Sequence, residues 1–246
     1  MARIITFANK KGGSGKTTVV VNLGAVLGKL GQRVLIMDLD PQSHATLISG
    51  IDTYEKKRGI GSVIRKSFPL TEAIVQGPQG LYDIIPSYHK DEPYVMYGLQ
   101  RDFRNFIDPV ADLYDFILID TPPSREDILI FSLSFSTELM IPLPLQFLAM
   151  EGLAELIGLL VKISKKINPD LKLTAVIPVM TGMRTNHAAG VCAQLEKIFN
   201  DKLLQTGIRQ DVKIADSAWN QLPVILYSPH TRASEDFLNL AQHILS

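Results

Sequence analysis

The stretch Lys11-Gly-Gly-Ser-Gly-Lys-Thr-Thr18 decides which fold this sequence is expected to adopt. It follows a short apolar run at residues 4–8 and opens an amphipathic segment at residues 19–30. A strand, a glycine-rich turn and a helix in this order form the context of a phosphate-binding loop, because glycine lets several backbone N–H groups point at one polyphosphate. The predicted nucleotide-binding residues are Lys11, Gly12, Gly13, Ser14, Gly15, Lys16, Thr17 and Thr18.

Two side chains of this loop have a predicted chemical role. The ammonium group of Lys16 is expected to reach the β- and γ-phosphates, and the Thr17 hydroxyl is expected to ligate Mg²⁺. The general pattern has glycine at the position of Lys10, and a second lysine, Lys11, stands five residues before Lys16. A glycine turn with two solvated lysines is the plain alternative, but the flanking strand and helix favour the phosphate loop.

Carboxylates follow two further apolar runs. Asp38 ends the run at residues 34–38, and Asp40 follows on a loop stiffened by proline. A carboxylate near a γ-phosphate can orient the attacking water or hold the hydration shell of Mg²⁺. For Asp38, a role in the site and a role as a helix cap or strand-end turn both stay open. Asp120 ends the run at residues 116–120 in the Walker B pattern, which predicts a magnesium ligand.

Apolar strands and helices alternate along the whole chain. Strands are predicted at residues 4–8, 34–38, 81–85, 116–120, 139–142 and 173–179. Helices are predicted at residues 16–30, as a pair between 59 and 76, around 98–111, and at 128–135, 149–168, 187–204 and 232–245. This order predicts an α/β fold with a doubly wound, mostly parallel sheet flanked by helices, whose ligands bind at the carboxyl ends of the strands.

Composition sets the limits for the chain. With 246 residues, 46% of them apolar, residues 1–246 can bury a full core as a single domain. The net charge of zero gives no global support for nucleic-acid binding. The single cysteine, Cys192, excludes an intrachain disulfide and favours a reducing compartment. No secretory signal and no membrane-spanning run are recognisable, and the five histidines lack ligand spacing, so a cytoplasmic protein is expected.

Together these motifs resemble the ParA/MinD ATPases, which carry a deviant Walker A loop. Lys11 matches the early lysine that crosses the dimer interface in that family and contacts the partner's phosphates. Asp40 matches the aspartate that positions the hydrolytic water, so the resemblance implies catalytic roles for Lys11, Lys16 and Asp40. It also implies Thr17, Asp40 and Asp120 as the metal-binding residues. Weaker matches at residues 149–153, 184–186, 208–211, 222–224 and 227–237 extend the likeness to the whole chain, in the order found in ParA/Soj partition ATPases.

The resemblance implies a single ParA-like ATPase domain that hydrolyses ATP slowly, with Mg²⁺, to ADP and phosphate. An ATP-dependent homodimer would bind DNA without sequence preference, and a ParB-like or other cargo adaptor would stimulate hydrolysis. The protein would position DNA or another large cargo and be associated with the nucleoid. Arg184 and Arg209 lie in the two loops that contribute to DNA binding in the family, although both can equally be solvated loop arginines. The loops at residues 180–186 and 208–211 are the expected adenine contacts.

Two departures from the family pattern leave the DNA and cargo contacts open. They lie at residues 145–153 and 216–222, and the second segment contains Trp219, expected to be packed or to face a partner. A MinD-like membrane-surface ATPase is the alternative function, but residues 235–246 carry no lysine or arginine for a membrane-binding helix, and no membrane partner is expected. An iron–sulfur reductase would need a second cysteine, and a small-molecule ligase would not need Lys11.

Overall fold

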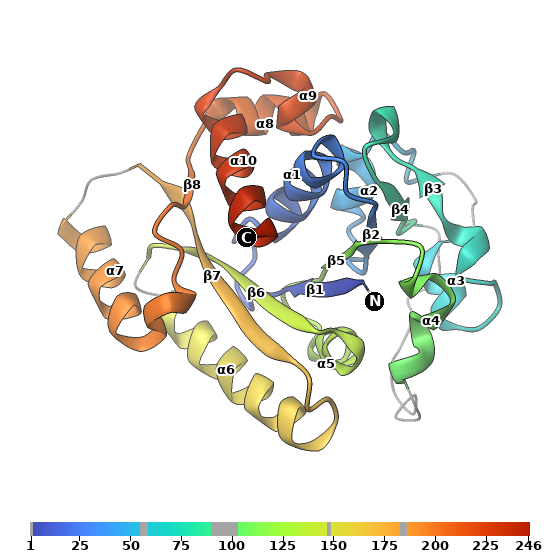
Figure 1. Ribbon diagram of the computed structural model, residues 1–246, viewed down its shortest axis with the longest axis horizontal. Helices are drawn as coiled ribbons and strands as arrows, with labels where there is room; N and C mark the ends of the chain where they lie inside the picture. Colours follow the sequence, from blue (N-terminus) through green and yellow to red (C-terminus); the bar gives the residue numbers. More distant parts are fainter. Residues whose placement is uncertain (1, 55–58, 90–102, 147–148, 183–185) are drawn as a thin grey trace.

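The computed structural model describes residues 2–54, 59–89, 103–146, 149–182 and 186–246 (Figure 1). Its centre is an eight-stranded sheet in the order β3-β4-β2-β5-β1-β6-β7-β8. Neighbouring strands run parallel, except that β3 and β4 pair antiparallel. The strands are β1 (Arg3–Phe7), β2 (Val34–Asp38), β3 (Val75–Gln76), β4 (Asp83–Ile85), β5 (Phe116–Asp120), β6 (Glu138–Pro144), β7 (Lys172–Thr181) and β8 (Ile208–Arg209). The predicted α/β class with a mostly parallel sheet is confirmed.

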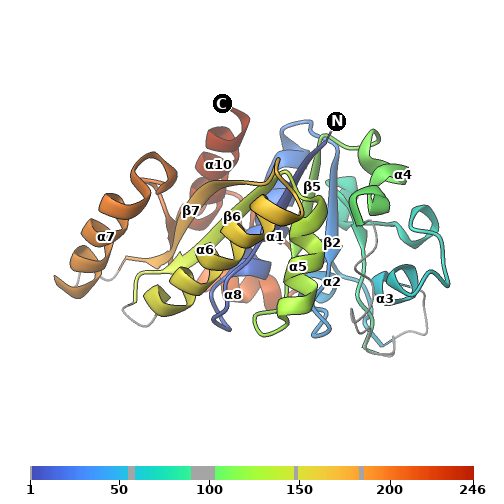
Figure 2. The same cartoon turned by 90° about the horizontal axis from the view of Figure 1, so that it is seen from below.

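Helices cover both faces of the sheet. The α-helices are α1 (Lys16–Lys29), α2 (His44–Ile48), α3 (Ile60–Ile64), α4 (Asp108–Ala111), α5 (Glu126–Phe135), α6 (Ala149–Lys166), α7 (Asn186–Phe199), α8 (Val212–Trp219), α9 (Val224–Tyr227) and α10 (Arg232–Leu245). Short 3₁₀ turns are η1 (Thr71–Ala73), η2 (Pro78–Gly80), η3 (Phe103–Phe106) and η4 (Asn200–Lys202). Figure 2 shows α5 and α6 on the face of the sheet opposite to α1.

The core consists of two layers because the central strands are buried on both faces. In β2, Ile36 packs with α1, α9 and α10, whereas its neighbours Leu35 and Met37 pack with α3, α4 and α5. Farther along the sheet, α5, α6 and α7 cover β6 and β7. Every residue of β2 and β5 is buried, which explains why these strands are continuous apolar runs in the sequence.

The ends of the chain are tied to the same sheet. Arg3 forms an ion pair with Glu138 of β6 and donates a hydrogen bond to the carbonyl of Ile244. Most apolar side chains of α10, among them Phe237 and Leu240, are buried in the layer that contains α1, whereas Leu245 at the end of the helix is exposed. The last helix therefore packs on the core beside α1.

Most predicted elements were found with small shifts at their ends. The strand predicted at residues 139–142 extends over Glu138–Pro144, and that at 173–179 over Lys172–Thr181. The helix predicted around residues 98–111 is shorter in its described part, where only a 3₁₀ turn and α4 occur, and residues 98–102 lie outside the described residues. The predicted pair between residues 59 and 76 is α3 followed by η1, and the helix predicted to end at residue 204 ends at Phe199 before η4.

Candidate functional site

The loop between β1 and α1 has the backbone shape that the glycines predict. Gly13 and Gly15 have φ values of 69° and 81°, in the left-handed region that side chains with a Cβ disfavour. Gly15 caps α1, whose first residue is Lys16 and whose first turn carries no acidic side chain. The exposed N–H groups of this helix end form a site that favours an anion.

Lys16 lies folded over this loop. Its side chain is buried, and Nζ donates to the carbonyl of Asn9 at 3.2 Å and to Ser14 Oγ at 3.5 Å. Burial lowers the pKa of Lys16, while the negative charges of Asp120 and Asp40 act in the opposite direction. A phosphate entering the loop would give this ammonium group a charged partner in place of two weak neutral ones.

Thr17 and Asp120 meet where β5 ends beneath the loop. Thr17 Oγ1 donates to Asp120 Oδ2 at 2.6 Å. The other carboxylate oxygen, Asp120 Oδ1, is the buried side-chain atom without a hydrogen-bond partner in the described part of the chain. Burial, and after it the charge of Asp38, raises the pKa of Asp120 well above its usual range. An unpaired carboxylate oxygen beside a hydroxyl oxygen suits a hard divalent cation, so these residues fit Mg²⁺.

Asp40 and Asp38 lie close together but have different surroundings. Asp40 is 7% exposed, and its Oδ1 accepts a hydrogen bond from the Gln42 N–H at 2.9 Å. Asp38 is fully buried, accepting bonds from the Asp40 N–H at Oδ1 and from the Thr46 N–H and hydroxyl at Oδ2. Burial raises the pKa of Asp38 to about 7, although the Thr46 hydrogen bonds lower it. Of the two interpretations left open for Asp38, the geometry favours the strand-end turn.

The sheet register explains how these acids come together. Asp38 of β2 and Phe7 of β1 are the direct neighbours of Asp120 on its two sides. Parallel strands place their carboxyl ends at one edge, so the loops after β1, β2 and β5 meet there. The structure therefore brings together Lys16, Thr17, Asp40 and Asp120, which the sequence predicted as separate motifs.

Adjacent lysines precede the glycines and have different partners. Lys10 Nζ forms ion pairs with Glu155 of α6 at 2.7 Å and with Glu126 of α5 at 3.4 Å. Lys11 Nζ instead donates to the neutral amide oxygen of Gln146 at 2.7 Å. The charge of Lys10 is thus matched by two acids, whereas Lys11 is held by a neutral group and forms no ion pair with the residues that the structure describes.

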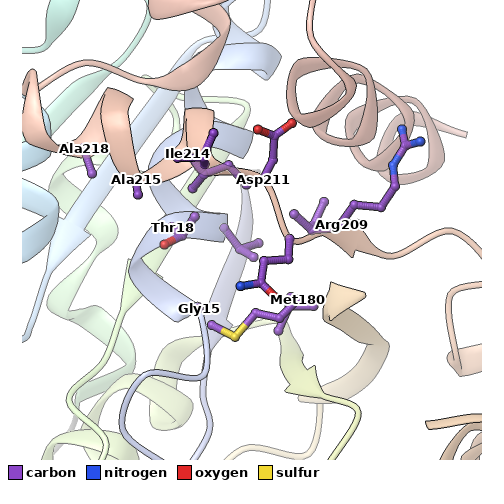
Figure 3. A pocket seen from close by; sticks show the side chains of 13 residues that line it. Gly15, Thr18, Met180, Arg209, Asp211, Ile214, Ala215 and Ala218 are labelled. Atoms are coloured by element: carbon purple, nitrogen blue, oxygen red, sulfur yellow. The ribbon is translucent and has the colours of Figure 1, made fainter. Parts of the chain in front are cut away.

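An apolar cavity of about 510 Å³ lies beside the phosphate loop. Figure 3 shows Met180 of β7 beside Gly15, and Ala215 of α8 beside Thr18 of α1, among the residues that line it. Residues 208–211 also line it, as expected for one of the two predicted adenine loops. In the other predicted loop, Met180 lines the cavity and residues 183–185 lie outside the described residues. The assignment of the adenine contacts stays a prediction, with a cavity of suitable polarity to receive the base.

Of the two predicted DNA contacts, Arg184 and Arg209, the structure describes only the second. Arg184 lies outside the described residues. Arg209 points away from the cavity toward α10 (Figure 3), where it pairs with Asp236 at 2.6 Å and Glu235 at 3.3 Å. The pair joins β8 to α10, and the carboxylate of Asp236 is almost fully buried at this junction. Contact between Arg209 and DNA stays a prediction. The ion pairs with Asp236 and Glu235 count against it, because they neutralise the charge that a DNA phosphate would need.

Sequence reasoning missed two asparagines that support the loop. Asn9 donates from Nδ2 to the Pro142 carbonyl and accepts the Lys11 N–H at Oδ1. Asn22, buried in α1, donates to the Thr18 carbonyl at 2.8 Å and accepts the Val224 N–H at 2.6 Å. A signal existed for Asn22, since it is a polar residue inside a continuous apolar helix segment and a buried amide must be hydrogen-bonded.

Comparison with known proteins identifies the family. The family model described as an AAA domain matches residues 2–173. The sporulation initiation inhibitor protein Soj of Bacillus subtilis is 33% identical, over 99% of this chain and 98% of its own length. This chain belongs to the ParA/Soj family of partition ATPases. Another ParA/Soj relative, the chromosome partitioning protein ParA of Caulobacter vibrioides, is 29% identical over 99% of this chain and 94% of its own.

A solved structure supports the fold of this ParA/Soj chain. Cobyrinic acid a,c-diamide synthase from Mycobacterium smegmatis, solved with bound ADP and magnesium, superimposes with a TM-score of 0.84 at 24% identity and covers 100% of this chain and 94% of the synthase chain. At this identity the likeness shows the shared fold alone. Among the helices of the described residues, none has both the length and the apolarity needed to cross a lipid bilayer.

Proposed function

We propose that this chain is a slow ATPase that dimerises when ATP is bound and positions DNA or another large cargo. One observation carries the proposal: Lys16, the Thr17 hydroxyl and the unpaired Asp120 oxygen converge at one edge of the sheet, with Asp40 close enough to influence the pKa of both Lys16 and Asp120. This set contains a phosphate-binding cation, oxygen donors for Mg²⁺ and an acid for the water.

The residues of the site divide between binding the phosphates, holding Mg²⁺ and orienting the water, and Asp40 takes part in the last two. The loop N–H groups and Lys16 hold the β- and γ-phosphates, and the apolar cavity receives the adenine. Thr17 and Asp120, with Asp40, would hold Mg²⁺, which when bound neutralises charge on the phosphates. Asp40 orients a water that forms the new bond to the γ-phosphorus while the bond to the ADP oxygen breaks.

Lys11 supplies the proposed link between ATP and dimerisation. Its ammonium group is held by the neutral Gln146 amide, so it can exchange that bond for a phosphate in the partner's site. A two-fold dimer would place both lysines in this position together. The ParA/Soj family membership is what supports this geometry.

Lys11→Ala is expected to bind ATP but to fail in dimerisation. Nucleotide binding should persist because Lys16 and the loop amides remain, whereas the charge that crosses between subunits is lost. Light scattering with ATP, in an Asp40→Ala background that slows hydrolysis, measures the dimer. The matched control is Lys10→Ala, which removes the neighbouring lysine with its two ion pairs and should still dimerise. If Lys11→Ala forms a stable dimer with ATP, Lys11 is not needed for dimerisation and this part of the proposal is wrong.

DNA binding is expected with ATP and hardly at all with ADP. As a monomer, this chain of zero net charge would contact few DNA phosphates. A dimer would present two copies of any basic loop on one face and would so contact twice as many. In a filter-binding or fluorescence assay, log K should fall linearly with log salt at a slope of about −0.9 for each neutralised phosphate. Absence of binding by the ATP form at low salt would contradict the DNA part of the proposal.

Arg184→Glu is the cleaner variant for locating the DNA contact. It should weaken binding to all sequences alike and leave DNA-independent ATP hydrolysis unchanged. Arg209→Glu would instead place a third carboxylate against Asp236 and Glu235, so a loss of binding there would also report loss of fold.

We propose further that a ParB-like or other cargo adaptor stimulates hydrolysis and that the protein associates with the nucleoid.

A further inference from the structure

The loop that carries Asp40 is fixed from both sides. On one side, the Asp40 N–H donates to Asp38 Oδ1 at 3.1 Å. On the other, the Asp40 carbonyl accepts the N–H of Ser43 at 2.8 Å, and Ser43 is fully buried with φ of 58°. A residue other than glycine keeps that conformation only where its surroundings impose it. The backbone around Asp40 therefore depends on contacts outside the loop.

Thr46 makes the contact that closes the loop. Its N–H and its hydroxyl both donate to Asp38 Oδ2, at 2.9 and 2.6 Å. The same hydroxyl oxygen accepts the N–H of Ser87, beyond β4, at 2.9 Å. One buried hydroxyl thus joins the end of β2, helix α2 and the segment after β4. Asp38 and Thr46 form a clamp around residues 39–45, and we refer to this pair as the Asp38–Thr46 clamp.

The clamp is separate from the groups that would touch the nucleotide. Both hydroxyl bonds of Thr46 are directed to Asp38 and Ser87, and three protein donors occupy the Asp38 carboxylate. The Thr46 hydroxyl and both Asp38 oxygens are therefore already engaged within the protein, whereas Asp120 Oδ1 has no hydrogen-bond partner among the described residues. Their effect on chemistry would be indirect, through the place at which Asp40 is held.

We propose that the Asp38–Thr46 clamp consists of positioning residues that hold the Asp40 carboxylate in place for the hydrolytic step. The proposal rests on the proposed role of Asp40. Loss of the clamp should leave ATP binding intact, because Lys16, Thr17 and the glycine loop lie on other elements. It should slow turnover, since a displacement of about 1 Å in a reacting group can cost on the order of a hundredfold in rate.

Thr46→Val tests this proposal with a small change. Valine keeps the shape of threonine but removes the hydroxyl that bonds Asp38 and Ser87. We expect kcat to fall about tenfold to a hundredfold while the dissociation constant for ATP changes less than about threefold. Thr46→Ser restores the hydroxyl and should recover most of the turnover. Single-turnover hydrolysis and nucleotide titration measure the two quantities separately.

Ser49→Ala is the matched control, because Ser49 carries a second buried hydroxyl and directly follows the same short helix as its C-cap residue. Its hydroxyl bonds the Ala45 carbonyl at 2.7 Å and the Tyr82 hydroxyl at 2.8 Å, and among the described residues its side chain makes no hydrogen bond to Asp38 or Asp40. Its loss should lower the urea midpoint of unfolding by an amount similar to that of Thr46→Val, because each removes a buried hydrogen-bonded hydroxyl, and it should leave turnover unchanged. Equal slowing in both variants would mean that the hydroxyls only support the fold and would overturn the proposal.

Asp40→Ala, measured in the same assays, separates the proposed role of Asp40 from the proposed role of the Asp38–Thr46 clamp. Parent-like turnover of Thr46→Val, with Asp40→Ala inactive, would overturn the clamp and leave the role of Asp40 standing. Parent-like turnover of Asp40→Ala would overturn the role of Asp40, and the clamp with it. Loss of ATP binding in Thr46→Val equal to its loss of turnover would assign Thr46 to substrate binding, against the proposal.

Discussion

Asp40→Ala is expected to bind ATP with Mg²⁺ and to hydrolyse it at least about a hundredfold more slowly than the parent chain. The carboxylate sits at the edge of the sheet with Lys16 and Asp120, but its protein bond is to a backbone N–H within its own loop. Its removal therefore leaves the phosphate-binding groups in place and takes away the acid that would orient the water. Phosphate release under single-turnover conditions measures the effect.

Asp40→Asn is the companion variant for this experiment. Asparagine can keep the oxygen that accepts the Gln42 N–H, so the loop should hold its shape while the charge is lost. If the negative charge of Asp40 is needed to orient the water, Asp40→Ala and Asp40→Asn should both hydrolyse ATP slowly. Asp52→Ala is a surface control, since this exposed aspartate lies on the loop after α2 and bonds the Tyr54 N–H. Hydrolysis by Asp40→Ala at the parent rate would exclude Asp40 from the mechanism.

Lys16→Ala is expected to lose nucleotide binding itself, by about 3 kcal/mol or more, which corresponds to roughly a hundredfold or more in the dissociation constant. The lysine is buried over the loop and meets the phosphates in the ground state as well as in the transition state. Without it, the phosphates would enter the loop with no buried cation to meet their charge. Isothermal titration with ATP and with ADP measures this loss.

Lys29→Ala provides the comparison for that variant. Lys29 is the last residue of the same helix and is exposed at the far end from the loop, so its removal changes net charge equally without touching the site. Its affinity for ATP should match the parent. If Lys16→Ala binds ATP as tightly as Lys29→Ala does, the phosphate loop assignment fails.

The sequence predicted the central strands best, since they are buried on both faces and hence apolar throughout. The bounds predicted for β2 and β5 agree with the structure, as do those of α10, whose apolar side chains recur at helical spacing. The edge strands β3 and β8 were missed because two residues carry no detectable periodicity. Helix α8 was missed as well, in the segment that departs from the family pattern, and it leaves Trp219 89% exposed.

By itself, the sequence determined the fold class, the family and the glycine turn between β1 and α1, because each depends on residues that are neighbours in the chain. Only the tertiary structure separated residues that look equivalent in sequence. The Asp38 carboxylate accepts two hydrogen bonds from Thr46, whereas the Asp40 carboxylate accepts one from the Gln42 N–H in its own loop. Lys10 and Lys11 differ likewise, because the acids that neutralise Lys10 lie more than a hundred positions away, on α5 and α6. Hydrogen bonds and ion pairs form between elements that the fold brings together, so no local pattern can assign them.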